Sequence, residues 1–245
     1  MAKVHGESKL TFLESMSIII GHGVGSGILS VPFLASRNNW HDIIWIAAVA
    51  YCMNLLLHFM IAELSLNNNG AQFIKCFENE LFVGKLKMAC TWLAFGLLGF
   101  SVVVNVSGFI TGAAAVFSAW FYLPSVVGML LFYVLAASVV YIGMKLVGIC
   151  EKIAVISMFG VIGILFVATM LSETTELSTK FYSNNNMLAL YSMIAFSLSA
   201  VMSVPQVVKG LEEDEKGIRK AIAAGTGLNM GLILLITFMT LRSEE

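Results

Sequence analysis

The segment GHGVGSGILSVPF, residues 21–33, lies inside an apolar stretch that runs from about residue 10 to residue 35. Its first seven residues contain four glycines, Gly21, Gly23, Gly25 and Gly27. A glycine costs about 1 kcal/mol in a helix interior, and backbone groups freed from a helix inside lipid cost more. Unwound backbone is tolerated at that depth where it is buried in protein or lines a cavity, so the segment predicts a broken membrane helix and a binding site. The alternative is a glycine-rich helix that packs closely against its neighbours.

The composition is that of a polytopic membrane protein. Of the 245 residues, 58% are hydrophobic and 12% are charged, and the mean hydropathy is +0.88. A net charge of −1 argues against a nucleic-acid partner. The four cysteines lie in or near apolar segments without the spacing of metal ligands, so we expect them to pack and predict no metal and no cofactor.

Seven apolar segments are long enough to cross about 30 Å of hydrocarbon as helices. They are residues 10–35, 41–64, 88–122, 125–144, 153–172, 187–208 and 221–241. The sequence therefore predicts an all-α membrane protein with seven spans. The third segment exceeds the bilayer thickness, which predicts a strongly tilted helix, and residues 122–124 predict a tight turn after it.

The lysines and arginines predict the orientation of these spans. Eleven of them fall in the N-terminus and the second, fourth and sixth loops, and three fall on the other side. Cytoplasmic loops carry the excess of positive charge, so we expect a multi-pass protein of the cell membrane with a cytoplasmic N-terminus.

The chain also contains an internal repeat. SGILSVP, residues 26–32, aligns with SAVMSVP, residues 199–205, with four of seven positions identical. The copies lie in the first and sixth spans, five crossings apart, so the second copy is inverted in the membrane. Inverted repeats with a discontinuous helix in each copy are typical of secondary transporters. We expect residues 1–172 to form a first five-helix repeat and residues 173–245 to begin a second.

GHGVGSGILSVPF resembles the first-span G-x-G-x-G-[ST]-G motif of amino acid permeases in the amino acid–polyamine–organocation superfamily, and the aromatic or neutral amino-acid branch looks closest. Residues 195–197 are similar to the A-F-S-G of their sixth span, and GMKLVGICEKI from Gly143 resembles their loop between spans four and five. The resemblance implies a LeuT-like inverted-repeat fold with broken first and sixth helices.

Two features depart from that family. Leu198 stands where those permeases usually have glycine, which implies a shorter or differently shaped break in the sixth span. The family has ten or more spans, and the eighth helps to line its substrate and cation sites. We therefore expect the missing spans to come from a longer chain or from another subunit.

The chemistry of a broken helix suggests how a substrate would bind. The second half-helix, beginning near Gly27, would point unpaired N–H groups and a partial positive charge at an α-carboxylate. The carbonyls that end the first half-helix near Gly21 would suit an ammonium group or a cation, and the resemblance implies that the substrate amine lies there. The predicted substrate-binding residues are Gly21, His22, Gly23, Gly25, Ser26, Gly27, Asn105, Ala195, Phe196, Ser197 and Ser199, and the predicted cation or proton coupling residues are Gly21, His22 and Val24.

Several of these residues have a second interpretation. His22 either carries a coupled proton or is a neutral ring bonded to a freed carbonyl. Phe196 either covers a substrate or packs, and Ser197 and Ser199 either contact it or bond back to their own helix. His58 is expected to be a packed or interfacial residue, and Glu63 to lie at the cytoplasmic interface.

The sequence thus predicts a secondary amino acid transporter that works by alternating access, coupled to a proton or sodium ion. One alternative is a non-transporting sensor or partner subunit that keeps the binding fold. A membrane enzyme using His22 and Ser26 would need a further catalytic group, and the nearest acid, Glu63, is expected half a membrane away. A polyamine transporter is a more remote possibility.

Overall fold

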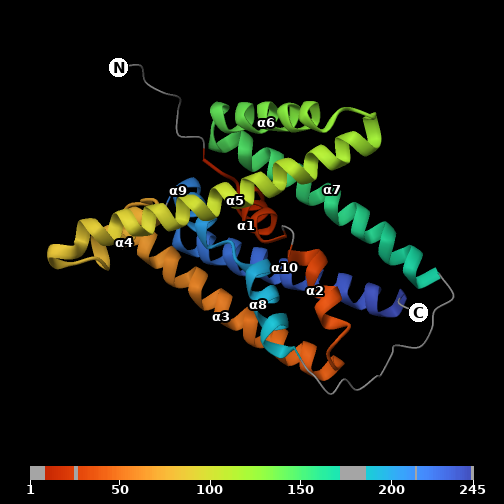
Figure 1. The fold of residues 1–245 in the computed structure, drawn as a ribbon. Helices are drawn as coiled ribbons and strands as arrows, with labels where there is room; N and C mark the ends of the chain where they lie inside the picture. Colours follow the sequence, from red (N-terminus) through yellow and green to blue (C-terminus); the bar gives the residue numbers. More distant parts are fainter. Residues whose placement is uncertain (1–8, 25–26, 172–185, 213, 244–245) are drawn as a thin grey trace. The chain divides into compact units, whose positions relative to one another are not determined.

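The computed structural model describes residues 9–24, 27–171, 186–212 and 214–243. Throughout these residues the secondary structure is helical, without a strand (Figure 1). The elements are α1 (Phe12–Val24), α2 (Gly27–Ala35), α3 (Trp40–Asn67), α4 (Phe73–Glu80), η1 (Gly84–Leu86), α5 (Lys87–Phe121), α6 (Ser125–Ile142), α7 (Met144–Leu171), α8 (Met187–Leu198), η2 (Val201–Ser203), α9 (Val204–Gly210) and α10 (Glu215–Ser243).

In the described part of the chain, 6 helical segments are long and apolar enough to cross a membrane. They are α3, η1 with α5, α6, α7, the run from α8 to α9, and α10. This confirms a polytopic, all-helical membrane protein. The first expected span consists of two shorter helices, α1 and α2, with residues 25 and 26 between them outside the described residues. A total of seven spans therefore stays a prediction.

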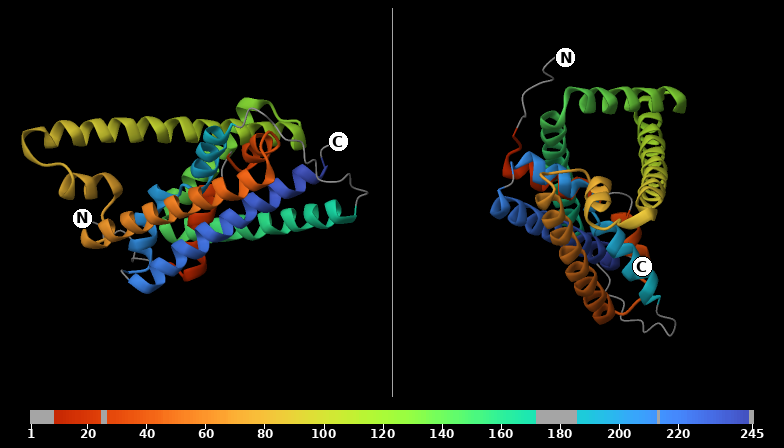
Figure 2. Two further views of the ribbon diagram at one scale, coloured as in Figure 1. Left: turned by 90° about the horizontal axis from the view of Figure 1, so that it is seen from below. Right: turned by 90° about the vertical axis from the view of Figure 1, so that its left-hand side faces the viewer.

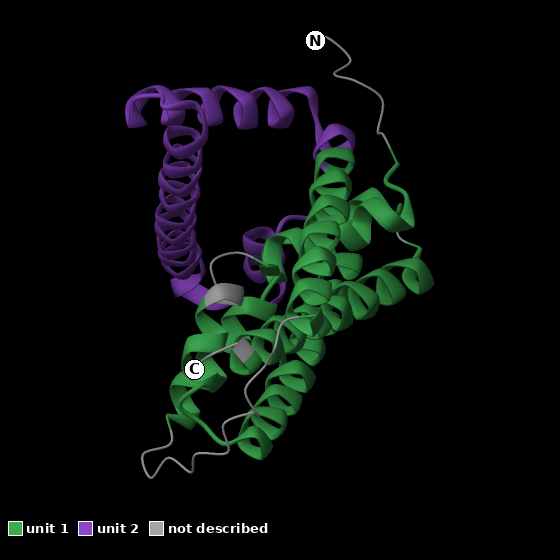
Figure 3. Cartoon of the chain, turned by 90° about the vertical axis from the view of Figure 1, so that its right-hand side faces the viewer, with its two compact units in different colours: residues 1–70, 148–245 green, residues 71–147 purple. Residues whose placement is uncertain are grey.

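Two compact units make up the chain (Figure 3). Unit 1 comprises residues 1–70 and 148–245, and unit 2 comprises residues 71–147. These units do not follow the expected repeats, 1–172 and 173–245. Compactness does not define a repeat, because repeats related by symmetry interleave in many transporters. The repeat boundaries stay a prediction.

Within unit 1, α10 packs against α1, α2 and α3, and α8 packs against α2 and α3 (Figure 2). The core of this unit is aliphatic. Ile20 of α1, Leu190 and Ile194 of α8, and Ile233 of α10 are fully buried in it. Within a bilayer such side chains stabilise the unit by close van der Waals packing rather than by removal from water. This packing brings the first and sixth predicted spans side by side.

Leu10, just before α1, is wedged between two glycines of unit 1. Its side chain is 2% exposed, and its backbone N–H donates to the carbonyl oxygen of Gly210 at 2.8 Å. A Cβ atom at Gly210 would overlap the Leu10 side chain, and one at Gly148 would come within 2.8 Å of it. A side chain at either position would therefore have to displace Leu10 from the space it fills.

Unit 2 contains the α5–α6 hairpin. The 35 residues of α5 exceed what a perpendicular span needs, as expected, and Tyr122 ends the helix in a left-handed conformation with φ 55°. A Cβ at Gly128 of α6 would lie 3.2 Å from the Cα of Ala114, so this glycine allows the two helices to approach closely. The tight turn predicted at residues 122–124 is confirmed.

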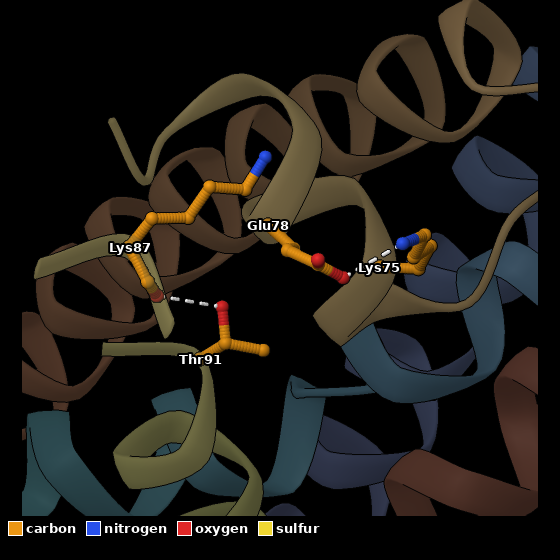
Figure 4. Close-up of polar contacts among 4 residues, drawn as sticks. All are labelled: Lys75, Glu78, Lys87 and Thr91. Carbon is orange, nitrogen blue, oxygen red and sulfur yellow. Dashed lines mark hydrogen bonds and ion pairs between the residues drawn. The ribbon is translucent and has the colours of Figure 1, made fainter. Parts of the chain in front are cut away.

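The short helix α4, also in unit 2, separates aromatic from charged side chains. The rings of Phe73 and Phe77 lie 4.3 Å apart, centroid to centroid. Lys75 donates to Glu78 at 2.8 Å, and the Thr91 hydroxyl donates to the Lys87 carbonyl at 2.9 Å (Figure 4). The Lys75 ammonium holds the pKa of the Glu78 carboxyl below its usual value, and Lys87 adds to that effect. These charges belong to the second loop, where the sequence places three lysines.

Candidate functional site

The sixth predicted span is interrupted in the middle. Helix α8 ends at Leu198, Ser199 and Ala200 are not helical, and the chain resumes as η2 and then α9. The sequence predicts a break near residues 196–200, and the structure confirms it at Ser199 and Ala200 alone. Residues 196–198 are still helical, so the prediction is wrong for them; leucine rather than glycine at position 198 helps to explain this, because leucine sustains a helix.

His58 of α3 accepts a hydrogen bond from a backbone N–H at the interruption. Its Nε2 accepts a hydrogen bond from the Ala200 N–H at 3.0 Å, and its Nδ1 lies 2.6 Å from the Asn54 carbonyl oxygen. Since Nε2 accepts, Nδ1 carries the proton and donates, which makes the ring neutral. Both His58 and Ala200 are fully buried. The sequence analysis expects a packed or interfacial residue here; His58 is packed, and it also pairs a backbone N–H that the interruption of the helix leaves free.

Asn229 of α10 pairs the last turn of α8. Its Nδ2 donates to the Ser197 carbonyl oxygen at 3.0 Å, while its Oδ1 has no hydrogen-bond partner among the described residues. The side chain is 1% exposed. The sequence analysis missed this residue. An asparagine within an apolar span is itself a signal, because a polar side chain there is costly unless it is bonded.

Helix α1 is continuous through Gly21 and Gly23 and ends at Val24, so the unwinding expected from Gly21 is wrong for residues 21–24. Contacts with neighbouring helices explain the first two glycines. A Cβ at Gly23 would overlap the amide of Asn229 and lie 3.0 Å from the Ser197 carbonyl oxygen. At Gly21 it would overlap the carboxylate of Glu151. Close packing thus accounts for Gly23, and Gly21 leaves the space that the Glu151 carboxyl occupies.

His22 lies between them and reaches the other broken span. Its Nδ1 is 2.9 Å from the hydroxyl oxygen of Ser203 in η2. Ser203 is 5% exposed, whereas His22 is exposed on the surface of the described residues. The structure therefore brings together the end of α1 and the resumption of the sixth span.

The other predicted site residues lie as follows. Gly25 and Ser26 are outside the described residues, and Gly27 is the first residue of α2. Ala195 packs against the core, and the Ser197 hydroxyl donates to the Met193 carbonyl on its own helix at 2.7 Å. Ser197 therefore bonds back to its own helix, which is the second of the two interpretations given above.

Phe196 is 53% exposed, and Ser199 caps the end of α8. Asn105 belongs to unit 2 and donates to the Ser101 carbonyl one turn back at 2.9 Å. Its place in the site stays a prediction. Among the described residues, no cluster of three or more His, Cys, Asp or Glu side chains could hold a metal ion.

A membrane protein with an interrupted helix and buried polar side chains beside the interruption is suited to bind a polar solute within the bilayer. Residues 8–242 match the tryptophan/tyrosine permease family. The chain belongs to that family. No curated protein and no solved structure matches it. This permease is therefore an amino acid transporter of the aromatic type rather than an enzyme, which rules out the membrane-enzyme interpretation of His22 and Ser26.

Proposed function

We propose that this protein is a secondary active transporter that moves tryptophan or tyrosine across the cell membrane by alternating access, coupled to a proton or a sodium ion. The interruption at Ser199 and Ala200 is the observation that carries the proposal. Its backbone is bonded to His58 of another helix, and Asn229 and His22 bond the residues on either side of it. A helix interruption held by three other helices is a feature of a transporter binding site.

The proposal includes the LeuT-like inverted repeat and membership of the amino acid–polyamine–organocation superfamily. Its support is the position of the repeated strings. SGILSVP begins at Ser26, directly before α2, and SAVMSVP begins at Ser199, directly before η2. The second copy thus begins at the interruption of the sixth span, and residues 27–32 of the first copy lie in α2. Helices α1 and α8 also pack against each other.

In this proposal the substrate α-carboxylate binds the N–H groups of Gly25, Ser26 and Gly27. The N-terminus of α2 carries a partial positive charge, and glycine permits close approach. The carbonyls at the end of α1 would hold the ammonium group or the coupling cation; because α1 is helical through Gly21, these carbonyls would be those near Val24. The partly exposed ring of Phe196 would lie against the aromatic side chain of the substrate.

The orientation follows from the same charges as in the sequence. With the eleven lysines and arginines of the even loops in the cytoplasm, the N-terminus is cytoplasmic. Lys75 and Lys87 of unit 2 then lie on the cytoplasmic side. Cysteines introduced at either end of α6 and labelled from outside intact cells would test this orientation.

Competition binding tests the substrate site. The purified protein is incubated with labelled tryptophan and challenged with unlabelled tryptophan, its amide and the amine that lacks the carboxylate. We expect the acid to compete best. Gly27→Val should abolish binding, whereas Ser26→Ala should weaken it by one hydrogen bond to a charged group, about 1.5–3 kcal/mol.

Two results would contradict the proposal. An amine that competes as well as the acid would exclude a carboxylate site and favour a polyamine-type substrate. Tight tryptophan binding without uptake into proteoliposomes, under any ion gradient, would favour a sensor or partner subunit over a transporter.

A further inference from the structure

The carboxyl group of Glu151 lies against the backbone of Gly21 in unit 1. Glu151 belongs to α7 and is partly buried, and Gly21 is the tenth residue of α1. A Cβ at Gly21 would overlap Oε2 of Glu151. The glutamate can therefore approach this helix only because residue 21 has no side chain.

The carboxyl of Glu151 makes no hydrogen bond or ion pair with any residue that the structure describes. Its sequence neighbour Lys152 instead faces Glu14 of α1, with Nζ and Oε1 3.8 Å apart. Glu14 also accepts from the Thr11 N–H at 2.8 Å and is 3% exposed. The titratable groups on the adjacent stretch of α1 are thus Glu14, already bonded, and His22, which lies beside Ser203.

This carboxyl lies inside both helices rather than in their first turns. Gly21 is nine residues beyond Phe12, about 14 Å along α1, and three residues before Val24, where α1 ends; Glu151 is seven residues beyond Met144, about 10 Å along α7. An ionised carboxylate without a partner is costly at such a depth, and a protonated carboxyl is far less so. The sequence set the fifth span at 153–172, which left Glu151 in a loop, but α7 begins at Met144 and that boundary is wrong.

We propose that Glu151 is the proton-binding site of this transporter, with Gly21 as the surface on which its neutral form packs. The inference rests on the proposed function and specifies its coupling ion. The carboxylate takes up one proton when water reaches it from one side of the membrane, and the neutral group packs against α1. It returns that proton to water on the other side, so that one positive charge crosses in each cycle.

A proton fits the surroundings better than a metal cation. The group that faces the carboxylate is the α-carbon of a glycine, which is not a ligand. No described cluster of acidic, histidine or cysteine side chains surrounds it. Protonation of Glu151 can be coupled to the proposed substrate site through α1, because His22 directly follows Gly21 and contacts Ser203 of the sixth span.

Proteoliposomes test the proposal with two assays on the same protein. The first measures tryptophan accumulation driven by an imposed pH gradient, and the second measures exchange of tryptophan at equal pH on both sides. Each unit of pH supports about tenfold accumulation per coupled proton. Glu151→Gln should lose that accumulation and keep exchange, now independent of pH. The matched control is Glu63→Gln, which removes an exposed carboxyl from α3 and should retain both activities.

Gly21→Ala provides a second test. The added methyl group displaces the carboxyl from α1, so the pH of half-maximal exchange should shift while the carboxyl itself is still present. A third measurement needs no variant. A hydrophobic carbodiimide reacts with protonated carboxyls in membranes, and its labelling of Glu151 in the wild-type protein, read by mass spectrometry, should fall as the pH is raised.

The outcomes separate this inference from the proposed function. Unchanged pH-driven accumulation by Glu151→Gln, accumulation driven by sodium instead of protons, or labelling of Glu151 that is independent of pH would each overturn the assignment. If Glu151→Gln does not fold, the labelling experiment decides alone. A wild-type protein that neither binds nor exchanges tryptophan would overturn the proposed function, whatever the labelling shows.

Discussion

The Ala200 N–H donates to Nε2 of His58 at 3.0 Å, although 142 positions separate these residues in the sequence. The bond joins α3 to the interruption of the sixth span. Because both residues are fully buried, water cannot replace it.

His58→Phe keeps a planar ring of similar size and removes the acceptor. It should lower the free energy of unfolding by about 1–3 kcal/mol, since the Ala200 N–H is left buried and unsatisfied. Thermal unfolding in detergent measures the change. His41→Phe is the control because His41 lies on the exposed start of the same helix. Equal losses in both variants would show that the bond contributes nothing specific.

Asn229→Asp should produce a pH-dependent defect. The substitution puts a carboxyl oxygen where Nδ2 donates to the Ser197 carbonyl, so the ionised form repels it and only the protonated form can donate. Stability should therefore be retained at low pH, where the introduced group is protonated, and lost as the pH rises and the group ionises. Unfolding between pH 4 and pH 8, with Asn79→Asp on the exposed face of α4 as control, measures this. A stability profile parallel to that of the control would contradict the prediction.

His22 and Ser203 should form one unit in substrate binding. His22→Ala and Ser203→Ala each remove the contact between α1 and η2. Because the same contact is lost in both, the affinity of the double variant for tryptophan should equal that of whichever single variant binds less tightly. His22→Gln should keep pH-driven uptake if Glu151 carries the proton. If His22→Gln loses pH-driven uptake but still binds tryptophan, His22 rather than Glu151 carries the coupled proton.

The pair on α4 should titrate as an exposed ion pair. Lys75 lowers the pKa of Glu78, so the pair stabilises the folded state above the usual glutamate pKa and ceases to do so as pH falls through the lowered value. Lys75→Met should move the Glu78 pKa back toward its ordinary value in a carboxyl ¹³C NMR titration. High salt should do the same in the wild type, because exposed pairs are screened. A Glu78 titration unaffected by either change would contradict the assignment.

The sequence predicts the helical spans well because their apolar length is a strong signal. The span ends are less certain, as α7 shows by beginning nine residues before the predicted 153. Glycine content alone could not separate a break from a packing contact at Gly21 and Gly23, since the distinction depends on Glu151 and Asn229, which are remote in sequence. The break after Leu198 was found through the repeat, but its bond to His58 was not, because sequence does not state which buried histidine meets which free N–H.

Leu10 holds the N-terminal end of α1 against Gly148 of α7 and Gly210 of α9. Any motion that swings this end of α1 away from α7 and α9 must withdraw the leucine from between Gly148 and Gly210 and break its 2.8 Å bond to the Gly210 carbonyl. Exposing one buried leucine costs about 1.5–3 kcal/mol, which shifts an opening equilibrium by one to two orders of magnitude. A single aliphatic side chain thus adds this cost to any such motion.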